Sequence, residues 1–443
     1  MTAGNVFNLL LGFALPLLLG NIFQQLYNTV DTWVVGNFVG KQSFSAVGTL
    51  SSVTNAIIGF FMGFSTGAGV VISRYFGSHE PEKVEKAVHT FVALTIIFCI
   101  VMTALGIFSI PLMIRILNSP EEVAVHQRIY LTIYFAGVSG LLVYNAGAAI
   151  LRAIGNSVYP FIFLFVTTVL NIGLDLLFVI VFKMGTAGVA YATILAQFIS
   201  AALVVFMLLT TDSVVRVRLN RIRVDWTMLG QIFSIGFPSA LQLSITAFSN
   251  VFVQRYINFF GTDVMGGWTA NSKVDQLFFL PINSLALAVT TFVSQNLGAG
   301  HISRARRGST ICLLMALVST GVMVLVVWVF APAIVDFFVE DSEERVIYYG
   351  SMFLRMNGVF IFAACVNQIY AGVVRAAGRS ELAMFYMLFS FVVFRQIYLF
   401  VMTKFISNTP QSVGISYPVG WIMCAILMFA TYLVVFPKVS EET

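Results

Sequence analysis

Residues 15–38 read LPLLLGNIFQQLYNTVDTWVVGNF, and this stretch decides how the rest of the chain is interpreted. It is long enough to cross a bilayer as a helix, because about 20 apolar residues span the hydrocarbon core. It nevertheless carries Pro16 near its start, the amides of Gln24 and Asn28 in its middle, and the carboxylate of Asp31 in its outer half. A carboxylate at membrane depth is costly unless it faces protein or water, so Asp31 is a candidate functional residue.

The composition of the whole chain also indicates a membrane protein. Of its 443 residues, 59% are hydrophobic and only 10% are charged, and the mean hydropathy is +0.92. A soluble globule of this length needs more polar groups to cover its surface. We therefore predict an all-α protein of the plasma (cytoplasmic) membrane. No short charged region with a cleavage site opens the sequence, so the first apolar segment is expected to remain as a span.

Apolar segments of spanning length recur twelve times along the chain. They are predicted at residues 13–38, 50–73, 89–112, 129–150, 159–182, 187–210, 228–256, 274–297, 309–334, 347–373, 383–406 and 414–437. The arginine-bearing stretch TDSVVRVRLNRIRVDW divides them into two sets of six. We predict an N-terminal six-helix bundle with a cation site at residues 1–211, a cytoplasmic linker at 212–227, and a C-terminal six-helix bundle at 228–443.

The loop charges predict the orientation. If both termini are cytoplasmic, the inner loops hold most of the Lys and Arg residues, as the positive-inside rule requires. The net charge of +5 is then mainly a topology signal, and contact with lipid headgroups is favoured over nucleic-acid binding.

The two halves of the sequence resemble each other. VYNAGAAILRAIGNS at 143–157 matches CVNQIYAGVVRAAGRS at 365–380, and Pro16 matches Pro238, with separations of 221 to 223 residues. Because each unit has an even number of spans, both enter the membrane the same way up. Two pseudo-symmetric six-helix bundles around a central cleft are the geometry expected of an alternating-access transporter.

The acidic residues inside clear spans lie only in the first half. Asp31 corresponds to Val253, and Asp175 corresponds to Tyr398. At 1.5 Å per residue, Asp31 and Asp175 each lie about 10 Å below the outer end of their span, and Thr193 lies roughly 9 Å down the sixth. Two further candidates are Asn171, which shares a helix face with Asp175, and Tyr130, which begins the fourth span.

Two carboxylates in one low-dielectric pocket cannot both be charged cheaply. At least one is expected to hold a proton, or a bound cation is expected to neutralise both. The alternative is that each aspartate is satisfied separately and only fixes helix packing.

These residues carry a resemblance to a known family. The chain resembles the multidrug and toxic compound extrusion (MATE) family over essentially its full length, in YNTVDTWVVG at 27–36, NIGLDLLF at 171–178, LRAIGNS at 151–157 and FVSQNLGAG at 292–300. It looks most like the branch whose coupling carboxylates lie in the N-terminal bundle. The resemblance implies an antiporter that exports organic, often cationic, compounds against protons or sodium.

The resemblance also implies roles for individual residues. The family's cation network maps onto Asp31, Asn171, Asp175 and Thr193, and Pro16 matches the proline at which the first helix is proposed to bend. The residues that line the neighbouring substrate cavity map onto Gln24, Tyr130 and Asn145, and we add Asn28 to this set.

No cofactor and no metal site are expected, apart from H⁺ or Na⁺ as the coupling ion, with Na⁺ possible at Asp31, Asp175, Asn171 and Thr193. The expected partners are small organic substrates and the lipid bilayer, with no nucleic acid, and the chain is expected to be a monomer.

Three other functions share some features with this sequence. A flippase for lipid-linked oligosaccharides shares the duplicated plan but calls for more cations lining the cleft. An ion channel calls for a pore lining repeated around an axis, whereas these acids lie in one half. A membrane-embedded enzyme is the alternative of a different class, but the sequence has no HExxH, GxSxG or GxxxxGK[ST] motif.

The second half carries basic residues in its spans. Arg355 and Arg395 lie near mid-span, and the sequence favours a structural role for them over the gating of charge. Lys273 and Asp275 are interpreted as a simple surface pair near the outer entrance of the eighth span.

Overall fold

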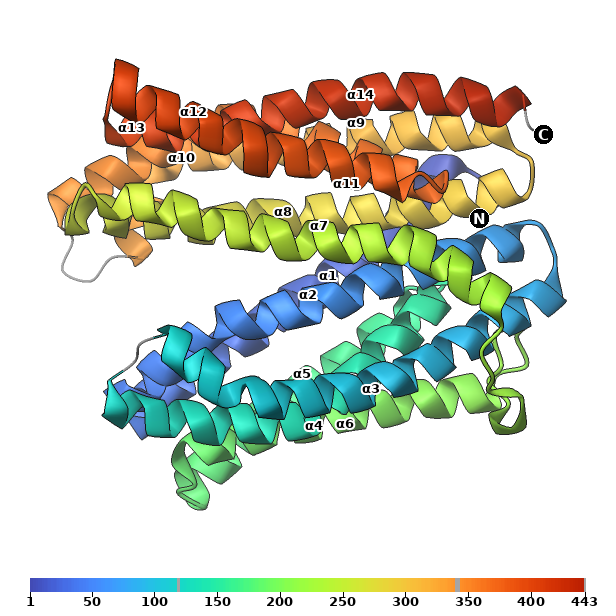
Figure 1. The fold of residues 1–443 in the computed structure, drawn as a ribbon, viewed down its shortest axis with the longest axis horizontal. Coiled ribbons are helices and arrows are strands. Elements are labelled where there is room, and N and C mark those ends of the chain that lie inside the picture. The colour runs from blue at the N-terminus through green and yellow to red at the C-terminus, as the bar shows by residue number, and fades with distance from the viewer. Residues whose placement is uncertain (118–119, 339–342, 442–443) are drawn as a thin grey trace. The chain divides into compact units, whose positions relative to one another are not determined.

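The structure is a computed structural model of the chain and describes residues 1–117, 120–338 and 343–441. These residues are almost entirely helical, and no strand occurs among them (Figure 1). Lipid offers no hydrogen-bond partners, so an unbroken helix is the way for each apolar segment to satisfy its own backbone. The prediction of an all-α membrane protein is confirmed.

The helices extend beyond the predicted spans at most ends. Those of the first half are α1 (Val6–Val34), α2 (Lys41–Gly77), α3 (Pro81–Leu117), α4 (Glu121–Ala153), α5 (Val158–Leu176) and α6 (Gly185–Thr210), with the π-helical segments η1 (Val35–Val39) and η2 (Leu177–Val181). Those of the second half are α7 (Trp226–Asn258), α8 (Thr262–Gly298), α9 (Ile302–Phe338), α10 (Glu344–Ala376), α11 (Ser380–Leu388), α12 (Arg395–Val401), α13 (Pro410–Gly414) and α14 (Ser416–Glu441), with the π-helical segments η5 (Phe389–Phe394) and η6 (Met402–Ile406) and the preceding 3₁₀ turn η3 (Leu219–Arg221). In the part of the chain that the structure describes, 11 helical stretches are long and apolar enough to cross a membrane. The predicted span at 50–73 lies within the 37-residue helix α2.

The internal repeat extends to the lengths of the helices. Helices α2 and α8 have 37 residues each, α3 and α9 have 37 each, and α4 and α10 have 33 each. Their starting residues are separated by the same interval that separates the matching sequence motifs. The two halves are therefore built on one plan, helix by helix.

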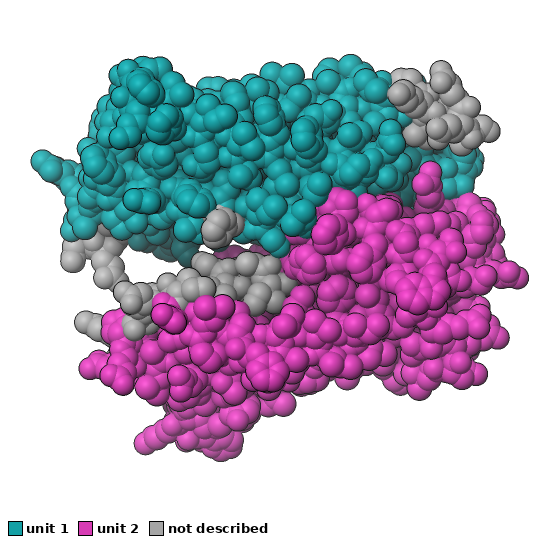
Figure 2. Space-filling view, in the orientation of Figure 1, with its two compact units in different colours: residues 1–14, 241–443 teal, residues 15–240 magenta. Residues whose placement is uncertain are grey.

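Packing divides the chain into two compact units (Figure 2). Unit 1 comprises Met1–Ala14 and Leu241–Thr443, and unit 2 comprises Leu15–Ala240. Both divisions fall within a helix and beside a proline, since Pro16 lies just after the first and Pro238 just before the second. Helices α1 and α7 thus contribute residues to both units. This division, which is based on packing, does not coincide with the predicted domain boundaries at residues 211 and 228. Those boundaries stay a prediction.

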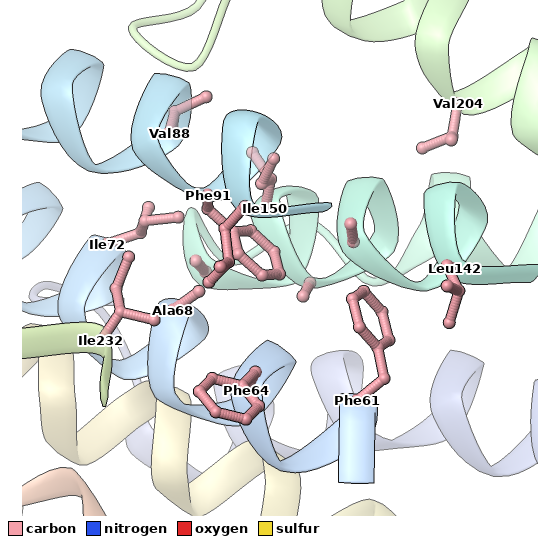
Figure 3. Packing of buried hydrophobic residues seen from close by; sticks show 14 of the residues in the cluster. Phe61, Phe64, Ala68, Ile72, Val88, Phe91, Leu142, Ile150, Val204 and Ile232 are labelled. Atoms are coloured by element: carbon pink, nitrogen blue, oxygen red, sulfur yellow. The ribbon is translucent and has the colours of Figure 1, made fainter. Parts of the chain in front are cut away.

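Each unit is organised around one central helix. In unit 2, α4 packs against α2, α3 and α6, and in unit 1, the matching helix α10 packs against α8, α9 and α14. The largest apolar cluster of unit 2 includes Ala68 and Ile72 of α2, Phe91 of α3 and Ile150 of α4, which Figure 3 shows gathered between these helices. Large apolar side chains on other faces, such as Phe108, remain exposed, as expected for helices that face lipid.

The segment between α6 and α7 is fixed to α3. The side chain of Val217 is buried, and the backbone N–H of Arg218 donates to His89 Nε2 at 2.9 Å. Arg221 Nη1 lies 2.7 Å from Glu85 Oε1. The predicted linker is therefore a docked strap on unit 2.

Helices α2 and α7 approach each other closely within unit 2. The sequence GFSTG at 63–67 places Gly63 against Ala240 and Gly67 against Gly236. A Cβ atom added at Gly67 would lie 2.6 Å from the backbone nitrogen of Gly236. Small residues four apart allow such backbone contact between helices in membranes.

Candidate ion-coupling site

Two aspartates from different helices meet inside unit 2. Asp31 lies on α1 and is 7% exposed, and Asp175 lies on α5 and is fully buried. Their carboxyl groups lie against each other, and the hydroxyl of Thr193 on α6 lies beside Asp31. The structure therefore brings together three of the four residues that the sequence assigned to the cation network.

The fourth residue belongs to a polar stripe on α5. Thr167, Asn171 and Asp175 are spaced four residues apart, so they share one face of the helix, and all three are buried. Ser200 on α6 donates a hydrogen bond to Thr167 Oγ1 at 2.8 Å. This polar face of α5 is thus turned toward α6 and away from lipid.

The backbone changes its winding just after each aspartate. The π-helical segment η1 begins four residues after Asp31, and η2 begins two residues after Asp175. These turns close with bonds from Gly40 N to Val35 O at 3.2 Å and from Phe182 N to Leu177 O at 3.0 Å. Single π-helical turns inside α-helices recur at functional sites, because they change the direction in which nearby side chains point.

Valine side chains pack beside the aspartates. A buried apolar cluster is formed by Val34 of α1, Val35 of η1, Val179 of η2 and Val189 of α6, and Tyr130 packs against it. Because these residues lie within about one turn of Asp31, Asp175 or Thr193, the cluster forms an apolar wall on that side of the pair.

Several polar atoms of the site are buried with no well-formed hydrogen bond to the described residues. They are Asp31 Oδ1, both carboxylate oxygens of Asp175, and both side-chain atoms of Asn171. Buried polar atoms of this kind are costly when unpartnered, and the oxygen atoms among them can be engaged by a proton or a cation. Asp31, Asp175, Asn171 and Thr193 present the oxygen atoms that could hold a proton or Na⁺.

Two tyrosines lie near the pair and a third packs on one of them; of the three, the sequence singled out only Tyr130. Tyr27 on α1 and Tyr130 on α4 lie in the electrostatic field of both carboxyl groups, and Tyr130 also lies beside the hydroxyl of Thr193. The ring of Tyr134 stacks on that of Tyr130 with centroids 6.0 Å apart. Tyr27 precedes Asp31 by four residues, so helical spacing alone could have identified it.

The remaining predicted residues lie farther from the pair. Gln24 and Asn28 share the helix face of Asp31 but are exposed. Asn145 lies about 22 Å along α4 from Tyr130, and its amide donates to Leu141 O at 2.9 Å. The cavity roles assigned to these residues stay predictions, as does the bending of α1 at Pro16, which lies inside a continuous helix.

The chain is similar in sequence and in fold to known multidrug transporters. The chain is 28% identical to the probable multidrug resistance protein YpnP of Bacillus subtilis over 97% of this chain and 96% of that protein. It is 22% identical to the multidrug export protein MepA of Staphylococcus aureus over 85% of this chain and 83% of that protein. A solved structure described as an outward-facing conformation of a multidrug resistance MATE family transporter superposes with a TM-score of 0.92, at 22% identity, over 99% of this chain and 97% of that one.

The fold agreement covers nearly the whole chain, and the sequence agreement covers both repeats. The MatE family model matches residues 16–177 and 235–401, which include most of α1 and α7 and all of α2 to α5 and α8 to α12. These findings confirm the resemblance drawn from the sequence motifs. The chain belongs to the MatE family and is a multi-pass membrane transporter.

Proposed function

We propose that this transporter exports small organic compounds, many of them cationic, in exchange for protons or sodium. The observation that carries the proposal is the approach of the Asp31 and Asp175 carboxyl groups inside unit 2. A buried acid pair is an electrostatic switch, because its charge depends on whether a proton or a cation is bound.

The charge of the pair links the two transported species. With both carboxylates unneutralised, the negative potential of the site favours a cationic guest nearby. Entry of a proton or Na⁺ removes that potential, so the guest is held less tightly and leaves. A ligand shifts a conformational equilibrium only through its different affinity for the two states, and the coupling ion supplies that difference here.

The contact between two buried carboxyl groups supports protons as the coupling ion. Asp31 is 7% exposed, Asp175 is fully buried, and the two groups lie against each other. A single proton shared between adjacent carboxyl groups lowers the cost of burying them. We therefore propose H⁺ as the coupling ion, with Na⁺ as the alternative.

We place both termini and the strap between α6 and α7 on the cytoplasmic side of the plasma membrane. The strap carries Arg216, Arg218, Arg221 and Arg223, and cationic loops are retained in the cytoplasm.

Purified protein in proteoliposomes tests the function and the ion together. We expect uptake of a fluorescent organic cation into inside-out vesicles when a pH gradient is imposed at constant sodium. A protonophore is expected to abolish this uptake, and a sodium gradient at constant pH is expected to drive none. Uptake driven only by the sodium gradient would assign Na⁺ as the coupling ion, and no uptake under either gradient would contradict the proposal of antiport.

The proline at the division between the units provides a separate test. Pro16 lacks an N–H, so α1 lacks one backbone hydrogen bond where its residues pass from unit 1 to unit 2. We expect Pro16→Ala to lower the transport rate several-fold while the melting temperature stays the same or rises, because a continuous hydrogen-bond ladder bends less easily. Pro111→Ala, in α3, is the matched control and is expected to transport normally. A Pro16→Ala protein that transports at the native rate would contradict a hinge at this position.

A further inference from the structure

Unit 1 contains a buried arginine at the place where unit 2 carries its acids. Arg395 opens α12 near the middle of the apolar stretch Ser380–Ile406 and is 3% exposed. Its Nη2 atom donates to Ser249 Oγ and to Asn250 Oδ1, each at 2.9 Å. Its guanidinium also lies over the ring of Tyr417, 4.7 Å from the centroid.

The repeat relates this centre to the acid pair. Asn250 matches Asn28, and Ser249 matches Tyr27, so the arginine is bound by the turn of α7 that corresponds to the Tyr27–Asp31 turn of α1. Arg395 itself corresponds to Ile172, next to Asn171 on α5. The place in the plan where α1 and α5 each carry an acid in unit 2 therefore holds one arginine, on α12, in unit 1.

The partners of Arg395 are neutral. Ser249 donates its own proton to Phe391 O at 2.9 Å, so its oxygen acts as an acceptor for the guanidinium. Among the described residues, no carboxylate lies within ion-pair distance of Arg395, and its Nε atom is buried with no hydrogen-bond partner. A guanidinium at membrane depth with neutral partners and an unused donor is expected to bind an anion.

One carboxyl group lies near Tyr417. Asp275 is partly buried on α8, accepts a hydrogen bond from Asn271 Nδ2 at 3.0 Å, and lies in the electrostatic field that Arg395 and Tyr417 share. It is not the surface partner of Lys273 that the sequence suggested. Asp275 is not within ion-pair distance of Arg395, so it does not neutralise the guanidinium directly.

We propose that Arg395, with Tyr417 and the Ser249–Asn250 turn, is a binding site for a small monovalent anion such as chloride. The anion would be bound at the unpartnered Nε edge of the guanidinium, which presents N–H donors in a planar fork. When Asp275 is ionised, its charge competes with the anion for the same positive centre. The site is independent of the exchange proposed for Asp31 and Asp175.

The stability of the full-length protein tests this site without a transport assay. The protein is prepared in sodium gluconate, and its melting temperature is measured as chloride replaces gluconate at constant ionic strength. We expect a saturable rise in the native protein, because a ligand that binds the folded state stabilises it. Arg395→Gln is expected to lose this rise, and Asp275→Asn is expected to reach its midpoint at a several-fold lower chloride concentration.

Arg355 provides the matched control. It is also near mid-span in unit 1, but it is exposed, its Nε donates to Trp328 O at 3.3 Å, and it lies over the Trp328 ring. Arg355→Gln is expected to keep the full chloride response. If Arg395→Gln does not fold, Ser249→Ala, which removes one ligand of the guanidinium, is expected to shift the chloride midpoint instead. A native protein with no saturable response, or an equal loss in Arg355→Gln, would overturn the proposal, and nitrate or acetate in place of chloride would show which monovalent anions the site accepts.

Discussion

Asp31→Asn and Asp175→Asn are each expected to reduce coupled transport to the level of protein-free vesicles. An asparagine keeps the shape of the side chain but cannot release a proton, so the site would no longer change its charge during the cycle. Because the two carboxyl groups lie against each other and form one site, the double variant is expected to be no worse than either single variant. Transport is measured in proteoliposomes under an imposed pH gradient, with equal amounts of protein.

Two controls make this result specific. Asp212→Asn changes an exposed acid of the strap, whose nearest cation is Arg216 at 4.0 Å, and is expected to transport normally. The melting temperatures of the Asp31 and Asp175 variants are expected to equal or exceed that of the native protein, since neutralising a buried acid pair removes a repulsion. Native rates in both variants would rule out the acid pair as the coupling site.

Gly67→Val is expected to prevent the protein from folding stably. The new side chain would begin 2.6 Å from the Gly236 nitrogen and 2.7 Å from Ile232 O, and both are backbone atoms that cannot move aside as a side chain could. Separating α2 from α7 at this crossing is expected to cost about 3 kcal/mol. The measurements are the yield of monodisperse protein after extraction from the membrane and its melting temperature.

The control lies two residues away on the same helix. Nothing lies within 4 Å of a Cβ atom added at Gly69, so Gly69→Val is expected to have near-native yield and melting temperature. If the two variants were equally stable, the close crossing would not be essential to the fold.

The sequence predicted the helices well because the thickness of the bilayer determines their length. Each predicted span agrees to within one residue with a helix or a run of consecutive helices, although the helices continue beyond the apolar segments, as α8 does from Thr262 to Gly298. An apolar segment of the sequence marks only the part of a helix that lies in lipid. The helix itself continues until the backbone enters a turn. The end of α1 at Val34 and its continuation as η1 have no simple sequence signal.

The polar sites were predictable to different degrees. Asp31, Asp175 and Thr193 could be placed together because each one's distance from a span end gives its depth. The partners of Arg395 could not be predicted, since Ser249 and Asn250 lie about 145 residues away and no local pattern links them. Asp275 was misplaced because its closeness to Lys273 in sequence suggested a pair, whereas its actual partner, Asn271, lies one helical turn before it.

The assignment of residues 1–14 to the unit that is completed last has a consequence for biogenesis. These residues are synthesised well before the helices with which they pack, which are encoded from Leu241 onward. Unit 2 likewise includes Trp226–Ala240, which emerge only after all six spans of the first half. Each unit therefore completes its packing only after residues of both halves have been synthesised, and residues 1–14 remain without their partners until the second half emerges.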